Sequence, residues 1–487
     1  MLCDKTEVMT INRYKTLAAN TIILGLGQFG SKFLVIIMMR FYQAALGTTG
    51  YGEINNIVDT AVLLMSFATL SIGESIIRFG LDKLYDNKQV FSIGMRVTFI
   101  GVIGCMLYVP LMGLLTVIFP DNSVFALLKD YSWLTVLYVA TGSTKSSVAL
   151  FVRSSGHVKL YAIDGILTTV MNILFNFLLL FGFKLGNVGY ILSVVFADVC
   201  SILFLFFAAR LKTQITFRID KELLKTMLRF SIPMIPTSIM WWIVNVSSSF
   251  MISEMMSFAD SGIYKAAYKL PSMISIFSGI FSQAWNMSAI TENNSSTIAK
   301  FYTNVFNIFQ SVVYVIAGGL MLVIRPAIMI LTEPEFYSAY VISPFLILSV
   351  SFTCFSTFMG SVYVASKKSV RSMTTSAIGA GLNIGLNLIF IQLWGLQGAT
   401  LAGFISFLAI FVIRAADTRK IVRMDIKLPK MLVNTALLLG MSVVIFLVED
   451  KPLYYGLLAV LFFIIVIINF KAGVDAVKMV LKKEVKE

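Results

Sequence analysis

Residues 160–209 read LYAIDGILTTVMNILFNFLLLFGFKLGNVGYILSVVFADVCSILFLFFAA, two apolar stretches joined by a short turn that contains Gly186 and Gly189. Each stretch has the roughly 20 residues that a helix needs to cross the hydrocarbon core of a bilayer. A membrane-spanning β-strand needs only about half that length. The segment therefore predicts two membrane-spanning helices that are connected as a tight pair.

The same arrangement recurs about 211 residues later, in the segment 370–415. The two copies share an asparagine pair and a glycine pair: Asn172 and Asn176 with Gly186 and Gly189 in the first copy, Asn383 and Asn387 with Gly395 and Gly398 in the second. The full repeat unit of about 211 residues holds six predicted spans, an even number, so both units have the same orientation in the membrane. The repeat predicts two parallel halves related by an axis along the membrane normal.

The composition places the whole chain in the membrane. Of its 487 residues, 58% are hydrophobic and 13% are charged, with a mean hydropathy of +0.86. Soluble domains carry about 25% charged residues. The composition excludes several water-soluble domains, and it also excludes disordered, collagen-like and disulfide-scaffold proteins.

Motifs for catalysis and for cofactor binding are missing from the sequence. The single histidine, His157, cannot build a histidine-based metal centre, and the four cysteines form no paired pattern. Neither a phosphate-binding loop nor a hydrolase motif occurs. We therefore expect no catalytic residues, no metal and no cofactor, and we expect the chain not to be an enzyme or an ATP-driven pump.

The apolar stretches predict an all-α integral membrane protein with about 14 transmembrane helices, arranged as two parallel pseudo-symmetric six-helix lobes plus two C-terminal helices. The predicted spans are 17–41, 54–79, 90–118, 123–151, 160–183, 186–209, 228–252, 262–290, 301–325, 338–365, 370–394, 396–415, 430–448 and 454–470. The predicted domains are an N-terminal lobe (1–209), a basic linker (210–229), a C-terminal lobe (230–415), two additional helices (416–470) and a basic tail (471–487).

The placement of lysine and arginine predicts the orientation of these spans. The N-terminus, alternate connections and C-terminus carry 29 of these residues, and the opposite connections carry only four. The termini, the linker and the tail are therefore predicted to be cytoplasmic. The net charge of +14 is then a topology signal, and no soluble basic face is left to bind nucleic acid. The basic, amphipathic linker and tail are expected to lie against anionic lipid.

Several cations lie inside predicted spans, where each costs about 3 kcal/mol at mid-bilayer. We predict that these cations form a cationic cavity for an anionic substrate: Lys32, Arg96, Lys145, Lys265 and Lys269. The alternative is that they pair with the in-span acids Asp59 and Asp198. Asp198, the most isolated acid, is either a site for a coupling Na+ or H+ or the partner of a lysine.

Other polar residues in the spans have simpler interpretations. Arg40, Glu74 and Asp164 lie near span ends, where structural roles are expected. The two asparagine pairs are expected to make interhelical hydrogen bonds. Trp241 and Trp242 lie in mid-span, where they either pack in the core or stack on a sugar ring.

Residues 230–285 carry a resemblance to a known family. The motifs are FSIPMIP at 230–236, WW at 241–242, GIYKAAYKLP at 262–271 and QAW at 283–285. They resemble the bacterial polysaccharide flippases of the multidrug/oligosaccharidyl-lipid/polysaccharide exporter superfamily, which move O-antigen, capsule and exopolysaccharide units. The plan of six, six and two helices extends this similarity over the whole chain.

The resemblance implies a flippase that moves undecaprenyl-diphosphate-linked oligosaccharide from the inner to the outer leaflet of a bacterial plasma membrane by alternating access. The sequence leaves open whether transport is driven by a Na+ or H+ gradient, by the membrane potential or by downstream polymerisation. Expected partners are a polysaccharide polymerase and chain-length machinery. Lys32, Lys265 and Lys269 would meet the diphosphate from the outer side, with Arg96 and Lys145 deeper in the cavity. The alternatives are a multidrug/cation antiporter of the same superfamily, a peptidoglycan-precursor flippase, and a membrane-embedded polymerase or ligase.

Overall fold

The computed structural model describes the backbone of residues 3–82, 84–291, 298–366 and 369–484, and the side chains of 34–82, 84–282, 299–363, 366 and 370–470. Within these ranges the secondary structure is entirely helical, joined by short turns. The chain divides into two compact units, Met1–Trp242 and Ile243–Glu487. The expected all-α fold is therefore confirmed.

The first unit is built around α6, which packs against α1, α2, α3, α7 and α8. Its helices are α1 (Cys3–Thr69), α2 (Ile72–Leu81), α3 (Asn87–Cys105), α4 (Tyr108–Ile118), α5 (Ser123–Asp130), α6 (Ser132–Ser154), α7 (Val158–Asn176), α8 (Gly186–Ala208) and α9 (Lys221–Ser231). A buried cluster that includes Phe79, Phe91 and Phe151 joins α2, α3 and α6. The predicted linker 210–229 packs in this unit, because Leu223 and Met227 of α9 belong to the same cluster.

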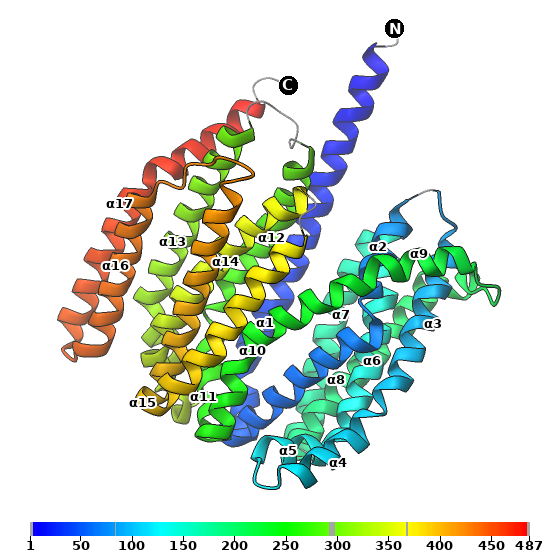
Figure 1. Cartoon of the computed structure of the whole chain (residues 1–487), viewed down its shortest axis with the longest axis horizontal. Coiled ribbons are helices and arrows are strands. Elements are labelled where there is room, and N and C mark those ends of the chain that lie inside the picture. The colour runs from blue at the N-terminus through cyan, green and yellow to red at the C-terminus, as the bar shows by residue number, and fades with distance from the viewer. Residues whose placement is uncertain (1–2, 83, 292–297, 367–368, 485–487) are drawn as a thin grey trace. The chain divides into compact units, whose positions relative to one another are not determined.

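The second unit is built around α14, which packs against α11, α12, α13, α15 and α16. Helix α10 (Ile235–Met255) crosses the division between the units, and the remaining helices are α11 (Phe258–Lys269), α12 (Ser272–Thr291), α13 (Ile298–Leu331), α14 (Ala339–Ala365), α15 (Ser369–Thr418), α16 (Leu428–Leu447) and α17 (Lys451–Glu484). Figure 1 shows α16 and α17 side by side at one edge of this unit. The rings of Phe306, Phe355 and Phe358 form part of its fully buried core.

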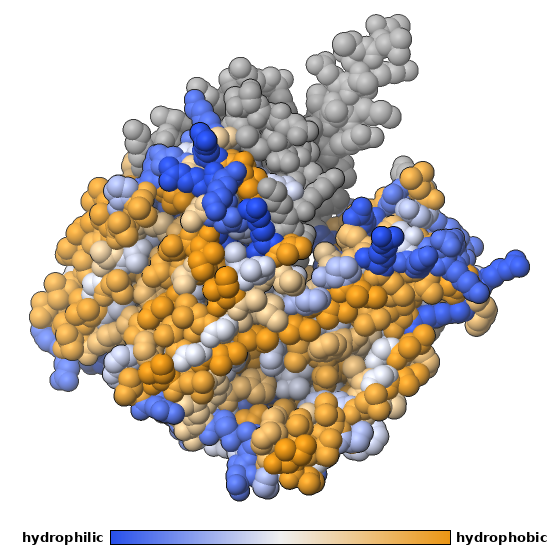
Figure 2. Space-filling model, in the orientation of Figure 1, coloured by the Kyte–Doolittle hydropathy of each residue, from blue (hydrophilic) through white to orange (hydrophobic). Residues whose placement is uncertain are grey.

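The surface of the helices is apolar, as expected for contact with lipid. Nine helices of the described residues are long and apolar enough to cross a membrane, or ten if the bent pair of α1 and α2 is one span. Each predicted span lies in one helix or in consecutive helices, and α15 contains two spans, on either side of Gly395. The total of 14 stays a prediction. Figure 2 shows apolar residues along the sides of the helices and hydrophilic residues gathered at their ends.

The repeat predicted from the sequence has the same local geometry in both units. Gly186 and Gly395 begin the second helix of each tight pair with φ of 55° and 57°, a left-handed conformation that favours glycine. Gly189 then lies against the preceding helix, where an added Cβ would meet the Leu179 carbonyl oxygen at 3.1 Å. At Gly398 the approach is closer still, and a Cβ would overlap the Phe390 carbonyl oxygen. These glycines allow two long helices to turn back on each other directly.

The Gly398→Ala variant is expected to lose about 2 kcal/mol of folding stability, because overpacking costs about 1–3 kcal/mol and backbone cannot move aside as a side chain can. Gly381→Ala is the matched control, since Gly381 lies in the same helix with nothing within 4 Å of its added Cβ. Thermal unfolding of the purified variants in detergent measures the difference. Equal midpoints for the two variants would contradict the close approach.

The asparagine pair of the second unit makes the expected interhelical hydrogen bonds. Ser247 of α10 donates to Asn383 Oδ1 at 2.8 Å, and Asn387 donates to Ser248 Oγ at 3.0 Å. Both bonds join α10 to α15. In the first unit, Asn176 donates to the carbonyl oxygen of Asn172 at 2.7 Å, within α7.

Candidate functional site

A polar pocket of about 550 Å³ lies inside the first unit, between α6, α7 and α8, with Met65 of α1 at its wall. Its lining includes one lysine and two aspartates: Lys145 from α6, Asp164 from α7 and Asp198 from α8. Hydroxyl and amide groups complete the polar lining, contributed by Tyr138, Ser146, Tyr161, Thr168, Thr169 and Asn172. Because each charge is costly inside a membrane bundle, this concentration of polar groups makes the pocket the candidate functional site.

Lys145 and Asp198 form an ion pair in this pocket. The Lys145 Nζ lies 3.4 Å from Asp198 Oδ1, and the two side chains are 26% and 9% exposed. Of the two roles predicted for Asp198, the structure therefore shows the pairing with a lysine. It does not test whether the same carboxylate also takes a coupling ion.

Asp164 is the second carboxylate of the pocket, and its side chain is buried, with the residue only 2% exposed. Ser201 of α8 donates a hydrogen bond to Asp164 Oδ1 at 2.6 Å. Helix α8 therefore contributes to both acids of the pocket. It carries Asp198 itself, and one turn later it carries Ser201, which donates to Asp164. The expected role of Asp164 as a residue near a span end does not anticipate this burial.

Gly142 makes room for this arrangement on α6. A Cβ at this position would overlap the Met65 methyl group and would lie 3.6 Å from Asp198 Oδ2. A larger residue here would therefore push against the acid and against the wall of the pocket. Glycine at position 142 keeps the Asp198 carboxylate close to the α6 backbone, one turn from Lys145.

The chemistry open to this site follows from its charges. One ammonium and two carboxylates share a space that holds hydroxyl and amide oxygens. When Lys145 is paired with Asp198, one negative charge remains on Asp164 if both acids are ionised. Such a set can exchange a proton or a small monovalent cation as the pairing of Lys145 changes.

The other predicted cations lie elsewhere. Lys265 and Lys269 are half-buried on one face of α11 in the second unit, where α11 packs against α14. The side chain of Lys32 falls outside the described residues, as does that of Trp285. The five predicted cations therefore do not all line one pocket of one unit, and their joint role in substrate binding stays a prediction.

Arg96 does not line the pocket of Lys145. Its exposed side chain lies on α3, and Nη2 donates to the Phe217 carbonyl oxygen at 2.6 Å. It borders a separate apolar slot of about 230 Å³ between α3, α6, α8 and residues 215–217. The contact fastens the linker to α3.

Trp242 of α10 contacts the α1 backbone at Asp59. The indole Nε1 of Trp242 donates to the carbonyl oxygen of Asp59 at 2.7 Å. Asp59, Trp241 and Trp242 are all half-buried. Trp242 is thus held by the backbone of α1, which favours the packing interpretation for this residue over stacking on a sugar.

The sequence does contain a signal for Asp164. Asp164, Thr168 and Asn172 recur every four residues, so they form one polar stripe on α7 that faces the pocket.

Arg414, in the second unit, is a buried charged residue that the sequence analysis did not select. It is 1% exposed in α15 and donates hydrogen bonds to Thr375, Ser356, Ser372 and Ser376.

Comparison with known proteins gives one family. The sequence profile described as "polysaccharide biosynthesis protein" matches residues 17–286, more than half of the chain. No curated protein matches the sequence.

Solved structures share the fold at low sequence identity. The lipid II flippase MurJ, in an inward closed conformation, is 15% identical with a TM-score of 0.63 over 94% of this chain and 99% of that protein. An inward-facing multidrug-resistance MATE transporter of the MOP superfamily is 14% identical, with a TM-score of 0.62 over 82% and 94%. The MATE multidrug transporter DinF-BH is 18% identical, with a TM-score of 0.62 over 83% and 95%. These matches show that this chain shares its fold with the MurJ flippase and with MATE transporters.

Proposed function

Because this chain belongs to the polysaccharide biosynthesis protein family, we propose that it moves undecaprenyl-diphosphate-linked polysaccharide repeat units from the inner to the outer leaflet of a bacterial plasma membrane. Its membership supports a role in polysaccharide export, and its fold is shared with a lipid II flippase. We propose that the termini are cytoplasmic and that a polymerase and chain-length machinery receive the product. In this proposal the chain is a transporter and performs no chemistry on the glycan.

The observation that carries the proposal is the charged pocket inside a bundle of apolar helices. A bundle that serves only as a scaffold gains nothing from Lys145, Asp164 and Asp198, whose burial is costly. In a transporter the same charges can bind an ion, and an ion that binds only one conformation shifts the equilibrium between conformations. We propose that the Asp164 and Asp198 carboxylates take a proton or Na+ during the cycle, and that Lys145 is the resident cation that this ion displaces.

The lysines of α11 have a different role in this proposal. Lys265 and Lys269 lie one turn apart, so both ammonium groups can meet one diphosphate. A diphosphate brings about two negative charges, and ammonium groups would offset the cost of removing it from water. We assign the same role to Lys32 and Arg96 along the path of the substrate.

The test uses a strain that lacks this chain, with its lipid-linked glycans extracted and located by leaflet. We expect diphosphate-linked repeat units to accumulate on the cytoplasmic side, and the intact gene to reverse the accumulation. The Lys269→Ala variant should restore less than about a tenth of export at normal membrane levels, because a charge-assisted hydrogen bond contributes about 1.5–3 kcal/mol. Lys269→Arg should be milder.

Other outcomes point to other functions. Repeat units that reach the outer leaflet unpolymerised would mean a polymerase or ligase. Unchanged lipid-linked glycans, together with loss of drug export from cells, would mean a multidrug antiporter. The pair of carboxylates in the first unit favours this second candidate specifically, since acids bind cationic drugs as well as coupling ions.

A further inference from the structure

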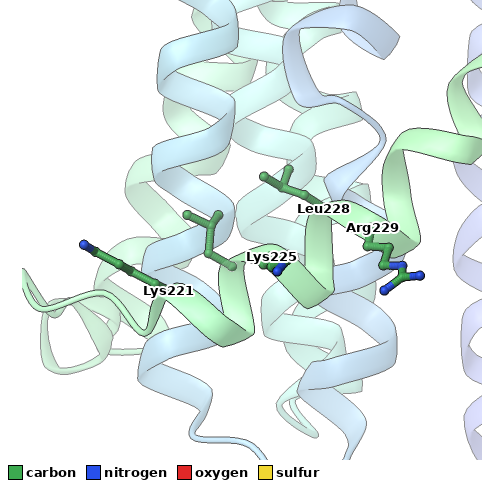
Figure 3. A pocket seen from close by; sticks show the side chains of 5 residues that line it. Lys221, Lys225, Leu228 and Arg229 are labelled. Carbon is green, nitrogen blue, oxygen red and sulfur yellow. The ribbon is translucent and has the colours of Figure 1, made fainter.

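Helix α9 presents three cations on one face. Lys221, Lys225 and Arg229 recur every four residues, and all three are exposed. At 1.5 Å per residue the row is about 12 Å long. With Leu224 and Leu228 the row lines a shallow groove of about 510 Å³. Figure 3 shows Lys221 and Arg229 at the two ends of this row, extending in opposite directions, with Leu228 between them.

The opposite face of α9 fixes the helix to the first unit. Leu223 and Met227 are buried in its core, and Ser75 of α2 donates to the Met227 carbonyl oxygen at 2.8 Å. The helix begins at a cap in which Asp220 Oδ1 accepts hydrogen bonds from the backbone N–H groups of Glu222 and Leu223 at 2.9 and 3.1 Å. The cationic row is therefore held in place before any ligand arrives.

The chain before α9 is fastened in the same way. Gln89 of α3 donates to the Arg218 carbonyl oxygen at 2.9 Å and accepts from the Asp220 N–H at 3.0 Å. Ser92 accepts from the Thr216 N–H at 2.8 Å. Between these contacts Phe217 is 88% exposed. An aromatic ring held out beside basic residues is typical of a segment at the boundary between water and lipid.

Helix α9 also lies where the chain enters the bilayer. The stretch Lys221–Met255 passes through α9 and α10 as one apolar helical stretch of 35 residues. The cations occupy its first third, on the side that the lysine and arginine distribution predicts to be cytoplasmic. Figure 2 shows hydrophilic residues gathered over this end of the first unit, directly above an apolar surface.

We propose that the α9 groove is a binding site for the headgroup of an anionic phospholipid. The phosphate would accept hydrogen bonds from the cationic row, and Leu224 and Leu228 would pack against the glycerol backbone and the first methylene groups of the acyl chains. The charges favour this occupant, because the groove is lined by three cations and two leucines with no acid among them. The site is separate from the pocket that contains Lys145.

Native mass spectrometry of the full chain in detergent tests the site, with dioleoylphosphatidylglycerol and dioleoylphosphatidylcholine as probes. We expect saturable binding of the anionic lipid and weaker binding of the zwitterionic one. The Lys221→Gln/Lys225→Gln/Arg229→Gln variant should bind phosphatidylglycerol about 100-fold more weakly, since each basic residue near an anionic surface contributes about fivefold.

Two variants serve as controls. Arg419→Gln/Lys420→Gln/Arg423→Gln removes three exposed cations from the second unit and should bind the anionic lipid normally. Lys221→Arg/Lys225→Arg keeps the charge row and should also bind it, which separates loss of charge from misfolding. Equal losses in both triple variants, or equal binding of the two lipids, would overturn the proposal. Binding of undecaprenyl phosphate without phosphatidylglycerol would also overturn it and would assign the groove to the lipid-linked substrate.

Discussion

The Asp198→Ala variant is expected to abolish transport and to lower the free energy of unfolding by about 3 kcal/mol. Asp198 pairs with Lys145 at 3.4 Å, and both side chains are largely buried. Removing one partner of a buried pair costs about 3–5 kcal/mol, because an uncompensated charge is left behind. The lower end applies here, since Lys145 keeps about a quarter of its exposure. Thermal unfolding and the export assay in the deletion strain measure the two effects.

The double variant Lys145→Met/Asp198→Asn separates folding from function. It removes both charges, so stability should return to within about 1 kcal/mol of the parent protein. If the pair changes partners during transport, export should remain abolished in this stable protein. Restored export would instead mean that the pair only holds α6 to α8. Asp164 is the neighbouring acid. The Ser201→Ala variant removes the hydrogen-bond donor to Asp164 and should lower the free energy of unfolding by less than Asp198→Ala does.

The second large effect is expected at Arg414. Its guanidinium joins the C-terminal part of α15 to the N-terminal part of the same helix and to α14. It donates to Thr375 Oγ1 at 3.0 Å, to the Ser356 carbonyl oxygen at 2.9 Å and to Ser376 Oγ at 2.8 Å. Arg414→Ala leaves a cavity and several unpaired polar groups, so a loss of about 4 kcal/mol is expected. Folded protein in the membrane should fall sharply, as measured by fluorescence-detected size-exclusion chromatography.

Arg371 provides the matched control for Arg414. Its Nη1 lies 2.9 Å from Asp417 Oδ1, but its side chain is 46% exposed. An exposed pair contributes about 1 kcal/mol or less, so Arg371→Ala should fold nearly normally. Arg414→Lys keeps the charge but cannot reach all of the partners, and it should give an intermediate loss. Equal yields for Arg414→Ala and Arg371→Ala would contradict the structural role of the buried guanidinium.

The helices were predictable from the sequence because their signals are local. An apolar run of about 20 residues needs no information about its neighbours, and the glycines at 186 and 395 mark turns that both units share. Deep charges are also visible in the sequence, since the cost of burying them singles out Lys145 and Asp198. Their pairing could be predicted only as one of two alternatives, because the two residues lie on α6 and α8, more than 50 positions apart, and the sequence does not say which lysine meets Asp198.

How deeply a charged side chain is buried was harder to predict than which charged residues lie in the spans. Asp164 lies near the start of a predicted span and yet is buried, because Ser201 of α8 covers its carboxylate. Arg414 lies one residue before the predicted end of the span 396–415, where a side chain would be expected to reach water, but α15 continues to Thr418 and the arginine is 1% exposed. In both cases the packing of neighbouring helices decides how far a charged side chain is from water.

The close approach at Gly189 and Gly398 has a consequence for how the chain is made. Two long helices joined by a turn of a few residues have no polar loop between them that could stay in water, and their backbone groups must be hydrogen-bonded inside the bilayer. We therefore expect each pair to enter the membrane as one hairpin, and a substitution at either glycine to lower the amount of inserted protein.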